Sequence, residues 1–176
     1  MRRTLVPMAL AVLLAGGCGG ESSTTGSATG SPNVGTTISA EDYARQADEL
    51  CRRAATEVTE LGIQEKGQEI LSGPGTTEEK LNQIAELLDQ QLQVVSDLRR
   101  DIEALGKPAT GGEDVDQFLE KTRSAEDELA RGIAAARDGD EGEFTDAMQR
   151  YAGLASQSAS IARDSELNFA ICGAGA

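Results

Sequence analysis

The apolar residues of this chain recur at intervals of three and four residues through four long segments, and this spacing limits the fold more than any other feature. The pattern is clearest between residues 81 and 105, where leucine, isoleucine and valine hold almost every such position. Residues at these intervals share one face of an α-helix, so each segment predicts an amphipathic helix. The alternation typical of a strand never extends beyond a few residues. We therefore expect an all-α fold.

Start and stop signals divide this pattern into four helices. Ser39 is a good N-cap for the first, and Thr76 with Glu79 three residues later forms a capping box for the second. Asp140 has the same relation to Glu143 and is expected to cap the fourth helix. Gly-Pro and Gly-Lys-Pro sequences end the first two helices. The helices are thus expected to begin near residues 39, 76, 113 and 140.

The connections between these helices are short, which makes consecutive helices antiparallel neighbours. The sequence therefore predicts an up-down-up-down four-helix bundle over residues 38–173. The apolar stripe of the fourth helix continues with helical spacing as far as Cys172. That helix is accordingly expected to reach almost to the end of the chain.

The first 17 residues have the pattern of an export signal. Arg2 and Arg3 supply a positive region, and an apolar run follows over residues 5–15 that is too short to span a bilayer. The sequence Ala15-Gly16-Gly17-Cys18 resembles a bacterial lipobox, except that Leu or Val is more usual at the position of Ala15. The resemblance implies cleavage before Cys18 and a diacylglycerol on its thiol. The alternative is an ordinary secretory signal in which Cys18 is incidental.

Residues 18–37 are rich in Ser, Thr and Gly and cannot bury apolar surface, so they are expected to form a flexible tether. Two acyl chains anchor a protein stably where a single chain does not. The expected location is therefore the extracytoplasmic face of the bacterial cell membrane, with the lipid on Cys18 as the membrane contact.

Two cysteines, Cys51 and Cys172, remain once Cys18 carries lipid, and only one pairing is possible. Both lie on apolar stripes, in the first and fourth helices, which are neighbours in such a bundle. We expect a disulfide between them; the alternative, two buried free thiols, is disfavoured in an oxidising compartment. Cys51 lies well inside the first helix and Cys172 near the end of the fourth. The first helix is therefore expected to overhang the bundle at its N-terminal end.

Composition argues against several function classes. The chain has no histidine, which excludes Ser-His-Asp and Cys-His catalysis and His-ligated metals. Its net charge of −14 disfavours nucleic-acid binding. The acidic residues near Asp138 lack the pattern of a calcium loop and favour a helix cap instead. No catalytic residue, metal site or cofactor is expected.

Gln91 stands within the apolar stripe of the second helix, and Tyr151 within that of the fourth. A buried polar residue at such a position can fix the register of a bundle. The alternative is that Gln91 and Tyr151 supply polar contacts in a small ligand cavity between the helices.

Taken together, these features resemble a type of small lipoprotein common in actinobacteria. The residues that carry the resemblance are the lipobox, the Ser/Thr/Gly tether and the two segments around the cysteines, 43–51 and 167–173. The resemblance implies a helical extracytoplasmic domain with one disulfide, and it implies no activity. We expect a non-enzymatic module that contacts an unknown protein of the cell envelope; the alternative is a carrier or sensor of a small apolar ligand.

Overall fold

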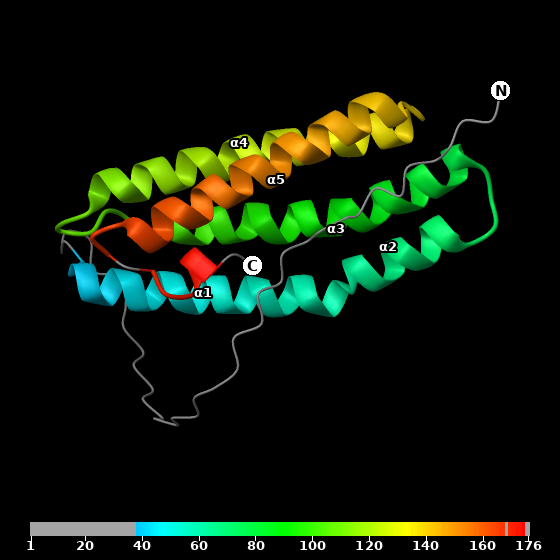
Figure 1. Cartoon of the computed structure of the whole chain (residues 1–176). Helices are drawn as coiled ribbons and strands as arrows, with labels where there is room; N and C mark the ends of the chain where they lie inside the picture. Colours follow the sequence, from blue (N-terminus) through cyan, green and yellow to red (C-terminus); the bar gives the residue numbers. More distant parts are fainter. Residues whose placement is uncertain (1–37, 168, 175–176) are drawn as a thin grey trace.

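The computed structural model describes residues 38–167 and 169–174, which form five α-helices and one 3₁₀ turn (Figure 1). The predicted signal peptide, Cys18 and the predicted tether lie outside the described residues. The elements are α1 (Ala40–Leu61), α2 (Ile63–Ser72), α3 (Thr77–Ala104), α4 (Gly112–Arg137), α5 (Glu141–Asp164) and the turn η1 (Cys172–Ala174).

The predicted N-caps are confirmed. The Ser39 side chain accepts a hydrogen bond from the backbone N–H of Asp42 at the start of α1. Thr76 and Glu79 form the reciprocal capping box that begins α3. Asp140 accepts a hydrogen bond from the backbone N–H of Glu143 and begins α5, so the acidic residues near Asp138 include a helix cap as expected.

The first predicted helix is divided in two at Gly62. This glycine has φ +61° and donates its N–H to the Thr59 carbonyl, which ends α1. Most other residues are strained in this left-handed conformation, whereas glycine adopts it readily. Helix α2 then starts in a new direction, as Figure 1 shows.

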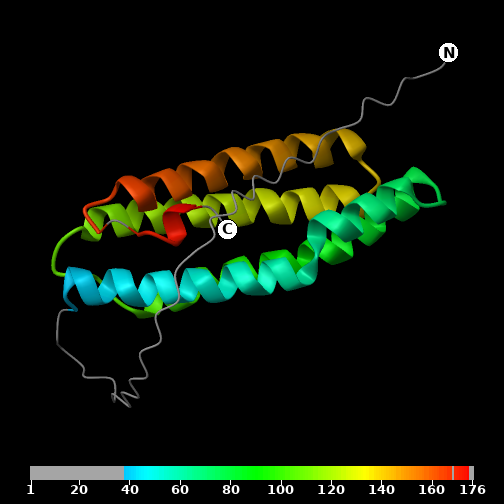
Figure 2. The ribbon, with the colours of Figure 1, turned by 60° about the horizontal axis from the view of Figure 1, so that its bottom comes forward.

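Successive helices pack as α1 on α3, α3 on α4 and α4 on α5, with α2 also against α3. With α1 and α2 taken together as the first helix, the chain runs up, down, up and down along one long axis (Figures 1 and 2). The predicted all-α four-helix bundle is confirmed. No helix among the described residues is long and apolar enough to cross a membrane.

The core consists of two clusters, one toward each end of the bundle. The first contains Tyr43, Ile102, Phe118 and Phe169 together with the two cysteines. The second joins the N-terminal half of α3 to the C-terminal half of α4, around Leu88 and Leu129.

The prediction for the end of the fourth helix is wrong. Helix α5 ends at Asp164, and Ser165 has an extended backbone, with φ −66° and ψ 157°. The chain then reverses, and the N–H of Phe169 bonds to the carbonyl of Ala162. Phe169 and Cys172 continue the helical spacing of the sequence, but they lie on a returning segment.

The predicted overhang of the first helix is also wrong, because this reversal brings Cys172 back alongside α1. The carbonyl of Ile38, just before α1, accepts from the N–H of Ala109 in the loop between α3 and α4. The N–H of Glu166, just after α5, bonds to Asp114 at the start of α4. The helix ends are therefore level at this end of the bundle.

Candidate functional site

The returning residues 165–174, of which residue 168 is not described, form what we call the closing segment. Its turn η1 contacts both α1 and α5, and Figure 1 shows it between these two helices. The closing segment therefore connects the first and last helices at one end of the bundle.

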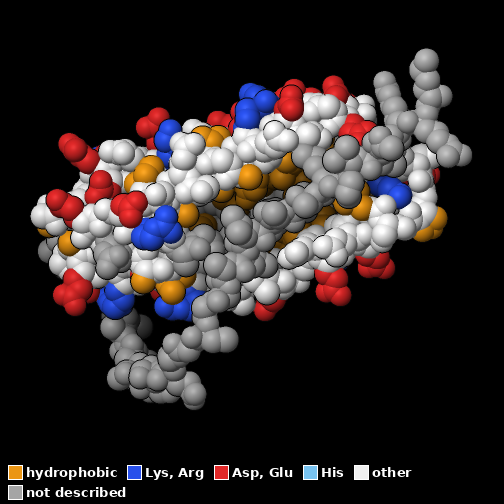
Figure 3. All heavy atoms as spheres, viewed as in Figure 1, with side chains coloured by type: hydrophobic (Ala, Val, Ile, Leu, Met, Phe, Trp, Pro, Cys, Tyr) orange, Lys and Arg blue, Asp and Glu red, His pale blue; other side chains and the backbone are white. Residues whose placement is uncertain are grey.

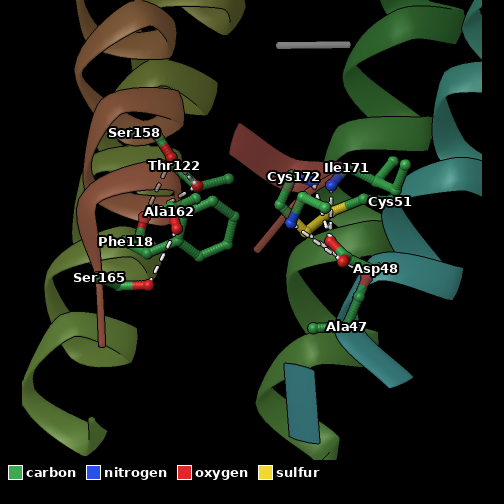
Figure 4. Close-up of a disulfide and its surroundings, with 11 residues drawn as sticks. Ala47, Asp48, Cys51, Phe118, Thr122, Ser158, Ala162, Ser165, Ile171 and Cys172 are labelled. Carbon is green, nitrogen blue, oxygen red and sulfur yellow. Dashed lines mark hydrogen bonds between the residues drawn. A yellow bond between two sulfur atoms is a disulfide. The ribbon is translucent and has the colours of Figure 1, made fainter. Parts of the chain in front are cut away.

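A disulfide joins Cys51 of α1 to Cys172 of η1, with 5.3 Å between the Cα atoms (Figure 4). This is the pairing expected from the sequence. Cys172, however, lies in the returning turn η1 and not in the fourth helix, where it was expected. Both cysteines are buried within the first core cluster.

Asp48, one helical turn before Cys51, holds the same turn through its carboxylate (Figure 4). It accepts hydrogen bonds from the backbone N–H groups of Ala170, Ile171 and Cys172 at 3.0, 2.9 and 3.2 Å. A carboxylate satisfies successive N–H groups at the start of a helical turn particularly well. Asp48 was not predicted from the sequence, where the available signal was an acidic side chain one turn from a cysteine on the same helix.

Packing and further hydrogen bonds complete the attachment of the closing segment. The ring of Phe169 lies against those of Tyr43 and Phe118, with centroids 6.1 and 6.2 Å apart. The Arg163 side chain donates to the carbonyl of Gly173. Gly111 lies in the loop between α3 and α4, and a Cβ there would come within 2.8 Å of the Leu167 side chain. This loop therefore approaches the closing segment more closely than a residue with a side chain would allow.

Tyr43 is fully buried, and its hydroxyl has no hydrogen-bond partner in the structure as described. Loss of hydration disfavours the charged phenolate, which raises the pKa of Tyr43 to about 12; the nearby charge of Asp116 acts in the same direction.

Gln91 and Tyr151 meet between α3 and α5, where the Gln91 side chain donates to the Tyr151 hydroxyl at 3.0 Å. Both residues are half-buried. Burial raises the pKa of Tyr151 above the ordinary value for tyrosine. The hydrogen bond links these two parallel helices, as a structural role for Gln91 would require.

Polar pairs also link the helices between the two core clusters. Thr122 and Ser158 lie 2.9 Å apart through their hydroxyls, between α4 and α5. Arg99 of α3 donates to Glu126 of α4 at 2.8 Å, with both side chains largely buried. The bond to Glu126 raises the pKa of Arg99 further, so the arginine is always charged.

A groove containing apolar side chains lies at this middle level, with α5 on one side and the helices α1 and α2 on the other (Figure 3). We define the central groove by four half-buried residues that pack against neither core cluster: Ala55 and Val58 of α1, Val95 of α3 and Ala155 of α5. From 91 to 99, every residue of α3 except Gln93 is half-buried rather than buried. The bundle is therefore less completely covered here than at either end.

Registry between the helices brings the four groove residues to one level. Val95 and Ala155 each lie one helical turn beyond the hydrogen-bonded pair Gln91 and Tyr151. The ion pair of Arg53 with Asp101 sets α1 antiparallel to α3 so that Val58 is level with Val95. The neighbouring exposed residues Thr59, Ala152 and Ser156 carry no charge.

Helix α5 presents a long uncharged surface. No charged residue occurs from Tyr151 to Ala162, although 26% of the chain is charged. The exposed members of this stretch are Ala152, Gly153, Ser156 and Gln157. We call these four residues the uncharged face of α5.

Two other hollows on the surface have charged linings. One lies between α1 and α3 and includes Arg53, Glu57, Val94 and Asp101. The other lies between α3 and α4 and includes Lys107, Asp116 and Arg123. Within the described residues no group of three or more His, Cys, Asp or Glu side chains is placed to hold a metal ion.

Comparison with protein-family models, curated proteins and solved structures finds no match to this chain.

Proposed function

We propose that this chain is a lipoprotein held at the extracytoplasmic face of the cell membrane by lipid on Cys18, with a helical domain that contacts other envelope proteins without catalysing a reaction. The disulfide suggests an extracytoplasmic location, because structural disulfides persist in oxidising compartments. The lipobox and the resemblance to small actinobacterial lipoproteins support the lipid anchor.

The observation that carries the interaction role is the uncharged face of α5. The core of a protein interface is depleted in charged residues, because burying an unpaired charge is costly. Small side chains such as Ala152, Gly153 and Ser156 also let a partner approach the helix backbone closely. Elsewhere on the face drawn in Figure 3, acidic and basic side chains are scattered over the surface.

Photo-crosslinking in the native cell envelope tests this role. A benzophenone amino acid replaces Ala152 on the uncharged face of α5. As a control it replaces Ala130 of α4, which is also exposed and lies beside Asp127 and Arg131. The proposal predicts a discrete protein adduct from position 152 and none from position 130. The same adducts from both positions, or none from position 152, would contradict it.

The alternative function is a carrier of a small apolar ligand, with Gln91 and Tyr151 as polar contacts inside a cavity. These side chains bond to each other at 3.0 Å, which supports a structural role for the pair. Neither of the two charged hollows includes Gln91 or Tyr151. The contact role on α5 is therefore the function that this geometry supports best.

A further inference from the structure

The central groove is uncharged and apolar in a chain of net charge −14. Ala55 and Val58 lie on the same face of α1 as Cys51, which faces the closing segment. Val95 and Ala155 each follow by one turn the hydrogen-bonded pair of α3 and α5, so they lie on the facing sides of these two helices. None of these side chains offers a polar group to a ligand. The chemistry of the groove therefore matches a hydrocarbon chain better than a peptide, whose backbone N–H and C=O groups need partners.

The closing segment limits the shape of an occupant. At the disulfide end, one non-helical stretch of chain with a 3₁₀ turn fills the space between α1 and α5 and contacts both helices. The central groove continues this space beyond Cys172, because Val58 lies two helical turns past Cys51. An α-helix with its side chains is about 10 Å wide. A slender occupant suits the narrow end of this space better than another helix.

The chain preceding the bundle has the length needed to deliver such an occupant. Residues 19–37 link Cys18 to Ile38, beside the first turn of α1. A Gly/Ser-rich chain of this length has an r.m.s. end-to-end distance of about 25 Å. From Ala40 to Val58 helix α1 rises about 27 Å. A tether gives the highest effective concentration, in the millimolar range, when its r.m.s. length matches the span to the site.

We propose that the central groove binds one acyl chain of the lipid carried by Cys18 of the same molecule. This inference rests on the proposed lipidation of Cys18. The groove and the membrane then compete for the anchor, and the domain shields part of its own lipid when the anchor leaves the bilayer.

The test uses the full mature chain purified from membranes, either intact or after a lipase has removed its ester-linked acyl chains. The probe is 11-(dansylamino)undecanoic acid, which fluoresces more strongly in an apolar site, and the protein is kept at nanomolar concentration without detergent. The treated protein is expected to bind the probe, and the intact protein to bind it at least tenfold more weakly, because its own acyl chain occupies the groove.

Two adjacent half-buried valines of α3 provide a matched pair of variants. Val95→Glu puts a charge into the groove and is expected to weaken probe binding by the treated protein at least tenfold. Val94→Glu is the control, because Val94 lines the charged hollow between α1 and α3 instead. Ala155→Trp blocks the groove with a ring and provides a second test if Val95→Glu unfolds the domain.

Three results would overturn the inference: no probe binding by the treated protein, equal binding by the intact and treated forms, or equal effects of the Val94 and Val95 variants. Equal binding by both forms would point to an external apolar ligand. The intact mass separates this inference from the proposed function. A chain without diacylglycerol on Cys18 contradicts both, whereas a lipid-bearing chain with no probe site contradicts only the groove.

Discussion

The Asp48 carboxylate accepts three backbone N–H groups of the closing segment, from Ala170, Ile171 and Cys172. Without it, three donors close to the core would have to find other partners. Unsatisfied donors are more costly than a lost surface contact, because their hydration is not replaced. Asp48 therefore positions the turn that carries Cys172.

Asp48→Ala is expected to lower the free energy of unfolding by about 2 kcal/mol, since charge-assisted hydrogen bonds are the stronger class. The control is Glu49→Ala, because Glu49 is exposed and pairs only with Arg52 among the interactions described here. That change is expected to stay within about 0.5 kcal/mol. Urea unfolding measures both, and equal effects would contradict the role assigned to Asp48.

Removal of the hydroxyl is expected to change the stability of the domain differently at the two tyrosines of the chain. Tyr43→Phe removes a buried group with no described partner, so the melting temperature is expected to stay the same or rise. Tyr151→Phe removes the acceptor of the Gln91 hydrogen bond and is expected to cost about 1 kcal/mol. Thermal unfolding of both variants checks this, and a clear loss of stability in Tyr43→Phe would show that its hydroxyl has a partner.

At the scale of the elements, local sequence signals located the starts of α1, α3, α4 and α5 but not the closing segment. The caps at Thr76 and Asp140 depend on residues three positions away, so they are visible in the sequence. The reversal after Ser165 depends instead on contacts with Asp48 and Cys51, more than 110 positions earlier. Helical spacing continues through Phe169 and Cys172, and it therefore predicted a helix where long-range contacts hold a turn.

The groove shows the same limit of prediction from sequence. Gln91 and Tyr151 could be singled out because they interrupt apolar stripes, but their mutual hydrogen bond needs the register of α3 against α5. In the sequence, Val58, Val95 and Ala155 cannot be distinguished from the other residues of the apolar stripes. Only the packing order of the helices shows that the middle of the bundle leaves them half-buried.

Glycine substitutions test the packing of the closing segment against the loop before α4. Gly111→Ala is expected to destabilise the domain by at least about 1 kcal/mol, because φ is +75° and the Cβ would lie 2.8 Å from Leu167. Gly153→Ala is the matched control, since it lies inside α5 with nothing within 4 Å of its Cβ. It is expected to stabilise by about 0.5–1 kcal/mol. Chemical unfolding that gave both changes the same sign would contradict the close approach at Gly111.

For the whole molecule, the disulfide connects residues 121 positions apart and so restricts nearly the entire unfolded domain. In the chain-entropy model a loop of this length stabilises by about 4–5 kcal/mol, often less in practice. The expected effect of reductant is a fall in melting temperature on the order of 10 °C. A Cys51→Ser/Cys172→Ser double variant should melt at the reduced temperature with or without reductant. No response of the native chain to reductant would contradict the stabilising role of the bond.

The proposed function also treats the molecule as one unit: an anchor at Cys18, a tether, and a bundle closed by a disulfide. These features belong together in an exported lipoprotein, because a structural disulfide persists in an oxidising compartment and two acyl chains hold the protein at the membrane. Lipid on Cys18 and the disulfide are therefore expected in the same molecule.

The decisive measurement is intact mass spectrometry of the protein extracted from native membranes. The expected chain begins at Cys18, carries diacylglycerol on that residue and has no free thiol at Cys51 or Cys172. A chain that retains Met1, carries no lipid and has two free thiols would contradict this expectation.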